Sequence, residues 1–368
     1  MIIGVPKEIK NKENRVGMVI AGVRALTQAG HKILIQTHAG QGVGISDEDY
    51  RKAGATIVGT PKEVYDKADM IVKVKEPLPE EYPLLRENQI LYTYLHLAAD
   101  ERLTKALMER KIIGIAYETI QPADGSLPLL APMSAVAGRM ATQIGATYLQ
   151  HDHGGKGLLL GGVTGVERGR VVILGGGVVG INAAKMAVGL GAHVTILDVN
   201  IHRLDYLADI FGNEVTTLYS NSEQVERAVT QADLVIGAVL VPGAKAPKLV
   251  TREMISRMSP GGVVVDVAVD QGGSVETCRP TSHEHPTYTV DGVVHYAVPN
   301  MPGAVPRTST YALTNVTLKY ALMIANLGWR AALTKDEALR KGLNILGGRV
   351  AYKQVADDLG LPFEAFTG

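Results

Sequence analysis

Residues 171–198 read VVILGGGVVGINAAKMAVGLGAHVTILD, and this stretch indicates the fold of the region around it. An apolar run over residues 171–174 leads into three closely spaced glycines and then into a helical pattern over residues 178–190. A second apolar run over residues 193–197 ends at Asp198. Strand, glycine turn, helix, strand and acid in this order are typical of a βαβ unit that binds a dinucleotide.

The three glycines have the spacing G-x-G-x-x-G, and we expect each of them to have a different physical role. Gly175 permits the tight turn from strand to helix, and Gly177 lets the backbone approach a pyrophosphate. Gly180 lets the helix and the strand pack closely. The N-terminus of the helix then offers N–H groups and the positive end of its dipole to the phosphates.

The acid at the end of the second run predicts which dinucleotide binds. Asp198 lies 18 residues beyond Gly180, where a carboxylate accepts hydrogen bonds from the ribose hydroxyls of adenosine. Its charge should repel a 2′-phosphate, so the sequence predicts NAD rather than NADP. Arg203 weakens this preference because an arginine can pair with a 2′-phosphate, although a solvated helix charge is an equal interpretation. A Gly-rich turn that binds no ligand is the alternative for the whole motif.

Short apolar runs alternate with helical patterns along almost the whole chain. The expected strands cover residues 2–5, 32–37, 70–74, 89–95, 111–117, 171–174, 193–197, 214–219, 234–237, 263–267 and 293–298. Helical patterns cover residues 100–110, 133–150 and 308–327 among others. Such alternation predicts an α/β protein with two Rossmann-like domains, each with a mainly parallel, doubly wound sheet.

At roughly 150 residues per domain, the 368 residues predict about two domains. The Pro-rich break over residues 121–132 ends the first series of strands. The segment after Pro306 is too short for a third domain, although it holds strong helical patterns. We therefore predict that residues 1–128 and 306–368 form one discontinuous substrate domain, into which an NAD-binding domain of residues 129–305 is inserted.

Composition and charge exclude several classes of protein. Lys plus Arg and Asp plus Glu each number 37, and this zero balance argues against nucleic-acid and polybasic membrane binding. Cys278 is the single cysteine, so the sequence shows no sign of an oxidising compartment. Neither a signal peptide nor an apolar stretch of ~18 residues is evident. We expect a cytoplasmic protein without a metal site, since the pairs His151/His153 and His283/His285 lack further ligands.

Nine longer strings are spread along essentially the whole chain. They are GVPKEIKNKENRV, VKVKEP, YLHLA, LPLLAPMSAVAGR, LLGGVTGV, GGGVVG, GAVLVPG, VDVAVDQGG and HYAVPNMPGAVPRTST. In these strings the sequence resembles the alanine dehydrogenases and their relative, the NAD-binding subunit of proton-translocating transhydrogenase. The resemblance implies a homohexamer that converts L-alanine, NAD and water reversibly to pyruvate, ammonium and NADH. A transhydrogenase-like NAD-binding subunit and a non-catalytic NAD-binding protein are the alternatives. VGMVIAGV after Arg15 departs from the Thr-Pro helix start that is common in the family.

The resemblance assigns catalytic roles to His96 and Asp270, and substrate binding to Arg15, Lys75 and Asn300. The planar fork of an arginine suits a carboxylate, and a histidine exchanges protons near neutral pH. Without the resemblance, Arg15 would be interpreted as a solvated loop charge and His96 as a satisfied core histidine. Asn300 follows the last expected strand, where its amide could meet the nicotinamide or the substrate.

Two of these assignments have a competitor. Lys73 and Lys75 lie on the same face of a strand, so spacing alone does not choose between them. Asp266 competes with Asp270, but it lies within a strand, where a bonded structural carboxylate is the simpler interpretation. Because ligands bind outside the carboxyl ends of parallel strands, we expect the assigned residues to converge on a cleft between the two sheets.

The resemblance also implies a set of cofactor contacts. Besides Gly175, Gly177, Gly180, Asp198, Arg203 and Asp270, they are Ser134, Val178, Val179, Ser220, Val239, Leu240, Val267, Val298 and Met301. Most of them follow an expected strand or start a helix. Ser134 has a competing interpretation as a helix N-cap, a position that serine favours.

Overall fold

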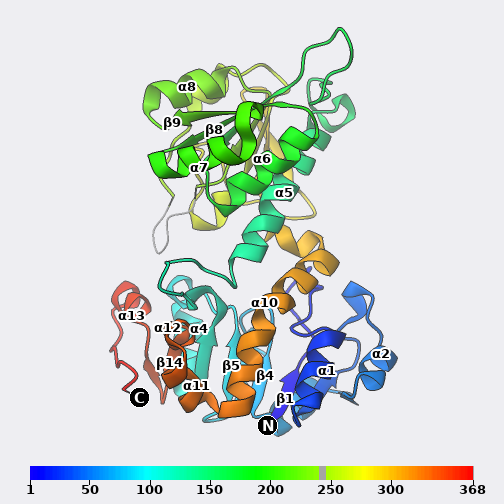
Figure 1. Cartoon of the computed structure of the whole chain (residues 1–368), viewed down its shortest axis with the longest axis vertical. Helices are drawn as coiled ribbons and strands as arrows, with labels where there is room; N and C mark the ends of the chain where they lie inside the picture. The colour runs from blue at the N-terminus through cyan, green and yellow to red at the C-terminus, as the bar shows by residue number, and fades with distance from the viewer. Residues whose placement is uncertain (240–245, 368) are drawn as a thin grey trace. The chain divides into compact units, whose positions relative to one another are not determined.

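The computed structural model describes residues 1–239 and 246–367, and the side chains of residues 270 and 271 lie outside this description. The chain divides into two compact units. The first unit holds Met1–Pro132 and Val305–Gly368, and the second holds Met133–Ala304. Each unit is an α/β layer structure around a mainly parallel sheet (Figure 1), which confirms the predicted fold class.

The first unit contains an eight-stranded sheet in the order β15-β14-β6-β5-β4-β1-β2-β3. Its strands are β1 (Ile2–Val5), β2 (Lys32–Gln36), β3 (Thr56–Val58), β4 (Met70–Val72), β5 (Ile90–Thr93), β6 (Ile113–Ala116), β14 (Leu343–Leu346) and β15 (Arg349–Val350). Strands β1 to β6 are parallel, and β14 and β15 are antiparallel to their neighbours. The strand order reverses between β1 and β4, which is where ligands bind in open α/β sheets.

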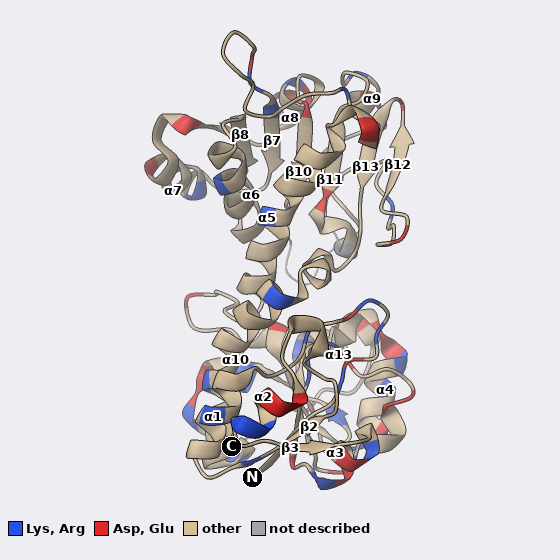
Figure 2. Ribbon diagram, turned by 90° about the vertical axis from the view of Figure 1, so that its right-hand side faces the viewer, with Lys and Arg blue, Asp and Glu red and all other residues tan. Residues whose placement is uncertain are grey.

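Helices cover both faces of this sheet (Figure 2). They are α1 (Ile20–Gln28), α2 (Asp47–Lys52), α3 (Pro61–Lys67), α4 (Glu101–Glu109), α10 (Pro306–Leu327), α11 (Trp329–Lys335), α12 (Glu337–Lys341) and α13 (Lys353–Leu359). On one face, Leu107 of α4 and Val355 of α13 belong to a buried cluster with Ile71 of β4. On the other face, the Tyr92 hydroxyl donates to the carbonyl of Thr317 in α10 at 3.1 Å.

The second unit contains a seven-stranded sheet in the order β12-β13-β11-β10-β7-β8-β9. Its strands are β7 (Arg170–Leu174), β8 (His193–Asp198), β9 (Val215–Tyr219), β10 (Leu234–Gly237), β11 (Val263–Asp266), β12 (Thr287–Val290) and β13 (Val293–Tyr296). All pairs are parallel except β12 with β13. Here the order reverses between β7 and β10.

The helices of the second unit also lie on both faces (Figure 2). They are α5 (Ala131–Tyr148), α6 (Val178–Gly189), α7 (Ile201–Phe211), α8 (Ser222–Thr230) and α9 (Arg252–Ser256). Val229 of α8 and Ile255 of α9 join Val235 of β10 in one buried cluster. Helix α5 approaches α6 so closely that a Cβ on Gly138 would lie 2.1 Å from the Val179 carbonyl oxygen.

The three glycines of the G-x-G-x-x-G motif have three different geometries. Gly175 has a φ of 98°, the left-handed region that lets β7 turn directly into α6. A Cβ on Gly180 would lie 1.9 Å from the Gly175 carbonyl oxygen, so only glycine allows this approach of helix and strand. A Cβ on Gly177 would meet no atom within 4 Å, so the space in front of this residue is open.

No helix among the residues that the structure describes is both long and apolar enough to cross a membrane.

Gly180→Ala is expected to destabilise the second unit by about 1–3 kcal/mol, because its Cβ must push α6 away from β7. Gly177→Ala is the matched control, since its Cβ enters open space. Urea unfolding followed by circular dichroism measures both variants. Equal unfolding midpoints for the two would contradict the packing role of Gly180.

Candidate active site

The predicted cofactor residues lie almost entirely along one edge of the sheet in the second unit. Gly175 and Gly177 follow β7, Asp198 ends β8, Ser220 follows β9, Val239 follows β10, Val267 follows β11, and Val298 and Met301 follow β13. Asn300, which is predicted to bind the substrate, also follows β13. These strands run parallel, so their carboxyl ends meet at this edge. Leu240 lies outside the described residues, as does the side chain of Asp270.

The centre of this edge is the point where the strand order reverses. A Cβ on Gly175 would lie 2.9 Å from the carbonyl oxygen of Ala238 and 3.1 Å from the backbone nitrogen of Val239. The ends of β7 and β10 are therefore packed backbone to backbone. Helix α6 begins here at Val178, and its first N–H groups have no partner within the helix. An anion such as a pyrophosphate fits this position.

Asp198 is joined to the glycine turn. Its carboxylate accepts the backbone N–H of Gly176 at 2.7 Å and that of Asn200 at 2.9 Å. The Nε of Arg203 donates to the carbonyl oxygen of Gly176, and its guanidinium lies 5.0 Å from the ring centroid of Tyr206. Arg203 is therefore anchored on the glycine turn, and its interpretation as a simply solvated helix charge is wrong.

Other predicted contacts have clear local settings. Ser134 is the fourth residue of α5, which begins at Ala131, so its competing interpretation as an N-cap is wrong. The N–H of Ser220 donates to the carbonyl of Asp198 at 2.9 Å. Asn300 has a φ of 56°, and its carbonyl accepts the N–H of Gly303 at 2.9 Å. This turn starts a short 3-10 helix, Met301–Ala304.

Asp266 has the geometry of a structural carboxylate. It is fully buried, and it accepts the backbone N–H groups of Ala268 at 3.0 Å, Ser274 at 2.8 Å and Val275 at 3.0 Å. Burial raises the pKa of Asp266 above its usual value, against the opposing effect of these hydrogen bonds. The three bonds close the loop that contains the backbone of Asp270.

In the first unit, Arg15 is buried, so its interpretation as a solvated loop charge is wrong. Only 2% of its side chain is exposed. Its Nε and Nη2 donate to the two carboxylate oxygens of Glu13 at 2.7 and 2.6 Å. Burial acts to lower the pKa of Arg15, but the hydrogen-bonded Glu13 outweighs it and the pKa is raised. The guanidinium is thus charged and fixed in orientation.

The structure separates the two lysines that spacing could not. Lys73 is fully buried, and its Nζ donates to Glu81 at 2.8 Å and to Glu8 at 3.1 Å. Burial acts to lower the pKa of Lys73, but the two carboxylates raise it above its usual value. Tyr65 donates its hydroxyl to the same Glu81 at 2.8 Å. Lys73 therefore belongs to a buried ionic cluster in the core.

Lys75 lies three residues beyond β4 and is half-buried. Its N–H donates to Glu8 at 3.4 Å, and its carbonyl accepts the hydroxyl of Thr93 at 3.0 Å. Burial lowers the pKa of Lys75, Glu76 opposes this effect, and the nearby Arg15 adds to it. Two neighbouring cations at a strand end suit the binding of a small carboxylate.

His96 is exposed, so its interpretation as a satisfied core histidine is wrong. It follows β5, and 44% of its side chain is exposed. Its ring stacks on that of Tyr94 with centroids 5.7 Å apart and planes 5° apart. Its backbone N–H donates to Glu118 at 2.6 Å. An accessible imidazole in this position can give and take protons.

Arg15, Lys75 and His96 thus follow β1, β4 and β5, three adjacent parallel strands of the first unit. The first two strands flank the point where the strand order reverses. A small cavity of about 130 Å³ is lined by Arg15, Glu13 and Glu8 among others. Lys75 and His96 do not line this cavity; they follow the two neighbouring strands.

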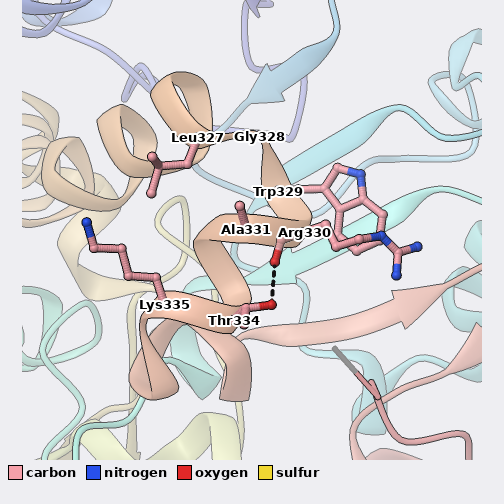
Figure 3. A pocket seen from close by; sticks show the side chains of 7 residues that line it. All are labelled: Leu327, Gly328, Trp329, Arg330, Ala331, Thr334 and Lys335. Atoms are coloured by element: carbon pink, nitrogen blue, oxygen red, sulfur yellow. Dashed lines mark hydrogen bonds between the residues drawn. The ribbon is translucent and has the colours of Figure 1, made fainter.

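A larger hollow of about 600 Å³ lies at the junction of α10 and α11 (Figure 3). It is lined by residues 327–331, Thr334 and Lys335, and Thr334 donates its hydroxyl to the carbonyl of Arg330 at 3.0 Å. None of the predicted site residues lines it, and it offers no carboxylate or imidazole. Among the residues that the structure describes, no three His, Cys, Asp or Glu side chains are grouped to hold a metal.

The carboxylates that hold these cations and the histidine were missed by sequence reasoning. They are Glu8 and Glu13 after β1, Glu81 after β4 and Glu118 after β6. The available signal was their position after strands of the same sheet. Charged loop residues are usually solvated, so this signal is weak.

Lys73→Met is expected to lower the free energy of unfolding by about 3–5 kcal/mol, because it leaves the buried Glu8 and Glu81 carboxylates without their cation. Lys75→Met is the matched control and should lower the free energy of unfolding by a smaller amount, since Lys75 is only half-buried. Urea unfolding measures both. Equal destabilisation by the two substitutions would contradict the separation of their roles.

Comparison with known proteins gives consistent matches along the chain. The family model described as Alanine dehydrogenase/PNT, N-terminal domain, matches residues 4–137, and Alanine dehydrogenase/PNT, C-terminal domain, matches residues 141–353. An alanine dehydrogenase of Methanococcus maripaludis is 63% identical over 364 residues, which cover 99% of this chain and 98% of that protein.

Two solved structures extend the comparison. An L-alanine dehydrogenase has a TM-score of 0.95 and 56% identity, with 98% of this chain and 99% of that chain covered. A transhydrogenase from Sinorhizobium meliloti has a TM-score of 0.82 and covers 96% of this chain and 99% of that chain. At 24% identity it shares the fold alone. From its sequence and its fold, the chain belongs to the alanine dehydrogenase/PNT family.

Proposed function

We propose that this chain catalyses the reversible NAD-dependent oxidative deamination of L-alanine to pyruvate and ammonium. The observation that carries the proposal is the row formed by Arg15, Lys75 and His96 at the ends of adjacent strands, in a chain 63% identical to an alanine dehydrogenase. A transhydrogenase-like subunit is not favoured, because the similarity to a transhydrogenase is limited to the fold at 24% identity.

The edge of the second unit fits NAD. The open space before Gly177 admits a pyrophosphate at the N-terminus of α6, and Asp198 lies beside the glycine turn to accept the ribose hydroxyls. Ser134, Ser220, Val239 and the residues after β11 and β13 would complete the site. When bound, NAD supplies the acceptor for the hydride that leaves the α-carbon of alanine.

Arg15 and Lys75 anchor the substrate in this proposal. The guanidinium of Arg15, whose Nε and Nη2 are oriented by Glu13, attracts the substrate carboxylate by its charge. Lys75 donates to the oxygen that forms on the α-carbon and stabilises charge there. Because burial lowers the pKa of Lys75, this group can also exchange a proton more readily than an exposed lysine.

His96 and Asp270 serve the proton transfers that accompany the addition of water and the release of ammonia. The substrate ammonium first gives up a proton to solvent, and loss of hydride from the neutral amine then leaves an iminium carbon. Water adds to this carbon while His96 takes a proton from that water. The C–N bond then breaks, the carbonyl of pyruvate forms, and ammonia leaves with a proton as ammonium. Asp270 holds the amine or the water during these steps. Asn300 is assigned to the substrate or the nicotinamide.

The finer assignments follow from the same proposal. Residues 1–128 and 306–368 serve as the substrate domain, and residues 129–305 serve as the NAD domain. The family resemblance supports a homohexamer that works in the cytoplasm. Light scattering after size-exclusion chromatography measures the assembly directly.

The purified chain is expected to form NADH from L-alanine and NAD, as followed by NADH absorbance. His96→Ala should lower kcat by about 10²–10⁴-fold because the proton carrier is lost. NADH binding, measured by its fluorescence, should persist in the variant. A His96→Ala enzyme with normal kcat would rule out the assignment, and a panel with glycine, serine and valine defines the specificity.

NAD is expected to exceed NADP in kcat/KM by at least about tenfold, because a 2′-phosphate would approach the Asp198 carboxylate and cost about 1.4 kcal/mol or more. Asp198→Ser should lower the ratio of kcat/KM with NAD to kcat/KM with NADP. Asp205→Asn, an exposed acid on α7, is the matched control and should leave the ratio unchanged. Equal efficiency of the unmodified chain with both cofactors would refute the role of Asp198.

A further inference from the structure

Strands β5 and β6 pair in parallel as far as Thr93 and Ala116. Beyond that point a carboxylate side chain, and not the neighbouring strand, accepts the backbone N–H groups. Glu118 lies two residues after β6, and its Oε1 accepts the N–H of His96 at 2.6 Å and that of Leu95 at 3.1 Å. One carboxylate therefore satisfies two successive N–H groups at the end of β5.

The backbone held in this way has an uncommon conformation. His96 has φ 49° and ψ 39°, in the left-handed region that residues other than glycine rarely adopt. Such conformations persist where the surroundings fix them, and they concentrate at functional sites. After His96 the chain enters a 3-10 helix, Leu97–Ala99, in which the Ala99 N–H donates to the His96 carbonyl at 3.0 Å.

The imidazole is placed by the same contacts. Its ring lies parallel to that of Tyr94, whose hydroxyl donates to the carbonyl of Leu129 at 2.6 Å. Its Nδ1 lies 3.9 Å from the Oε1 of Glu118, which is beyond hydrogen-bond distance. Glu118 therefore hydrogen-bonds the backbone of His96 and not its ring. The orientation of the ring is set by the backbone conformation of the turn.

We propose that Glu118 is the positioning residue for His96. By accepting the N–H groups of Leu95 and His96, it holds the left-handed turn that keeps the imidazole accessible at the carboxyl edge near Lys75. The inference rests on the proposed function, since the position of His96 affects turnover only if His96 exchanges protons with the substrate. Hydrogen-bond acceptance, rather than negative charge, is the property that matters.

Three substitutions separate acceptance from charge. Glu118→Gln keeps an acceptor oxygen at the same reach and removes the charge, whereas Glu118→Asp keeps the charge and loses one methylene of reach. Glu118→Ala removes both. Glu109→Gln, at the exposed end of α4, is the matched control.

Glu118→Asp and Glu118→Ala are expected to lower kcat for L-alanine by about a hundredfold, since a displacement of ~1 Å has this effect. Glu118→Gln should stay within a few-fold of the unmodified chain, and the KM for NAD should be unchanged in all variants. Full activity in Glu118→Asp together with low activity in Glu118→Gln would overturn the proposal. If Glu118→Ala does not fold, the Gln and Asp variants still distinguish hydrogen-bond acceptance from negative charge as the property that matters.

Hydrogen–deuterium exchange tests the same idea without the reaction. In a peptide covering residues 94–99, the amides of Leu95 and His96 should exchange faster in Glu118→Asp and Glu118→Ala, and at the original rate in Glu118→Gln. Unchanged exchange in all three variants would overturn the positioning role. An unmodified chain that makes no NADH from L-alanine would instead contradict the proposed function, so the two failures are distinguishable.

Discussion

The parallel pairing of β4 with both β1 and β5 is the constraint on which the candidate site depends. Met70 pairs with Ile3 on one side and with Ile90 on the other, so three carboxyl ends reach the same edge of the sheet. The loops that carry Arg15 and His96 both start from this edge. The backbone ladders thereby bring together segments that are far apart in the sequence, and the second unit uses the same principle around its glycine turn.

Much of the fold could be predicted because apolar runs and helical patterns report burial directly. The strands that the alternation missed are β3, β12, β14 and β15, which the structure places at or near the edges of the two sheets. They are short, and β15 has two residues. β3, β12 and β15 each have one paired neighbour, and an edge strand of this kind carries no long apolar run. β14 pairs on both sides and is largely buried, but Asn344 interrupts its short apolar run. The glycine turn could be predicted in detail because positive φ and close packing require glycine.

The site was less predictable, because the partners of each charge come from distant segments. Lys73 and Lys75 are two residues apart and share one face of the expected strand. Only the buried carboxylates and the end of β4 distinguish the core cation Lys73 from Lys75, the proposed substrate ligand. Likewise, the hydrogen bond from His96 to Glu118 depends on the register of β5 with β6. Family resemblance supplied the proposed reacting groups, whereas the carboxylates that hold them required the structure.

The central claim is that a small carboxylate substrate binds at the carboxyl edge of the eight-stranded sheet. A crystal structure of the chain with NADH and pyruvate, prepared without ammonium so that no turnover occurs, tests it most directly. The account predicts pyruvate with its carboxylate on the guanidinium of Arg15 and its carbonyl oxygen within hydrogen-bond distance of Lys75 or His96. Pyruvate bound away from this edge, with none of these three side chains in contact, would contradict the account.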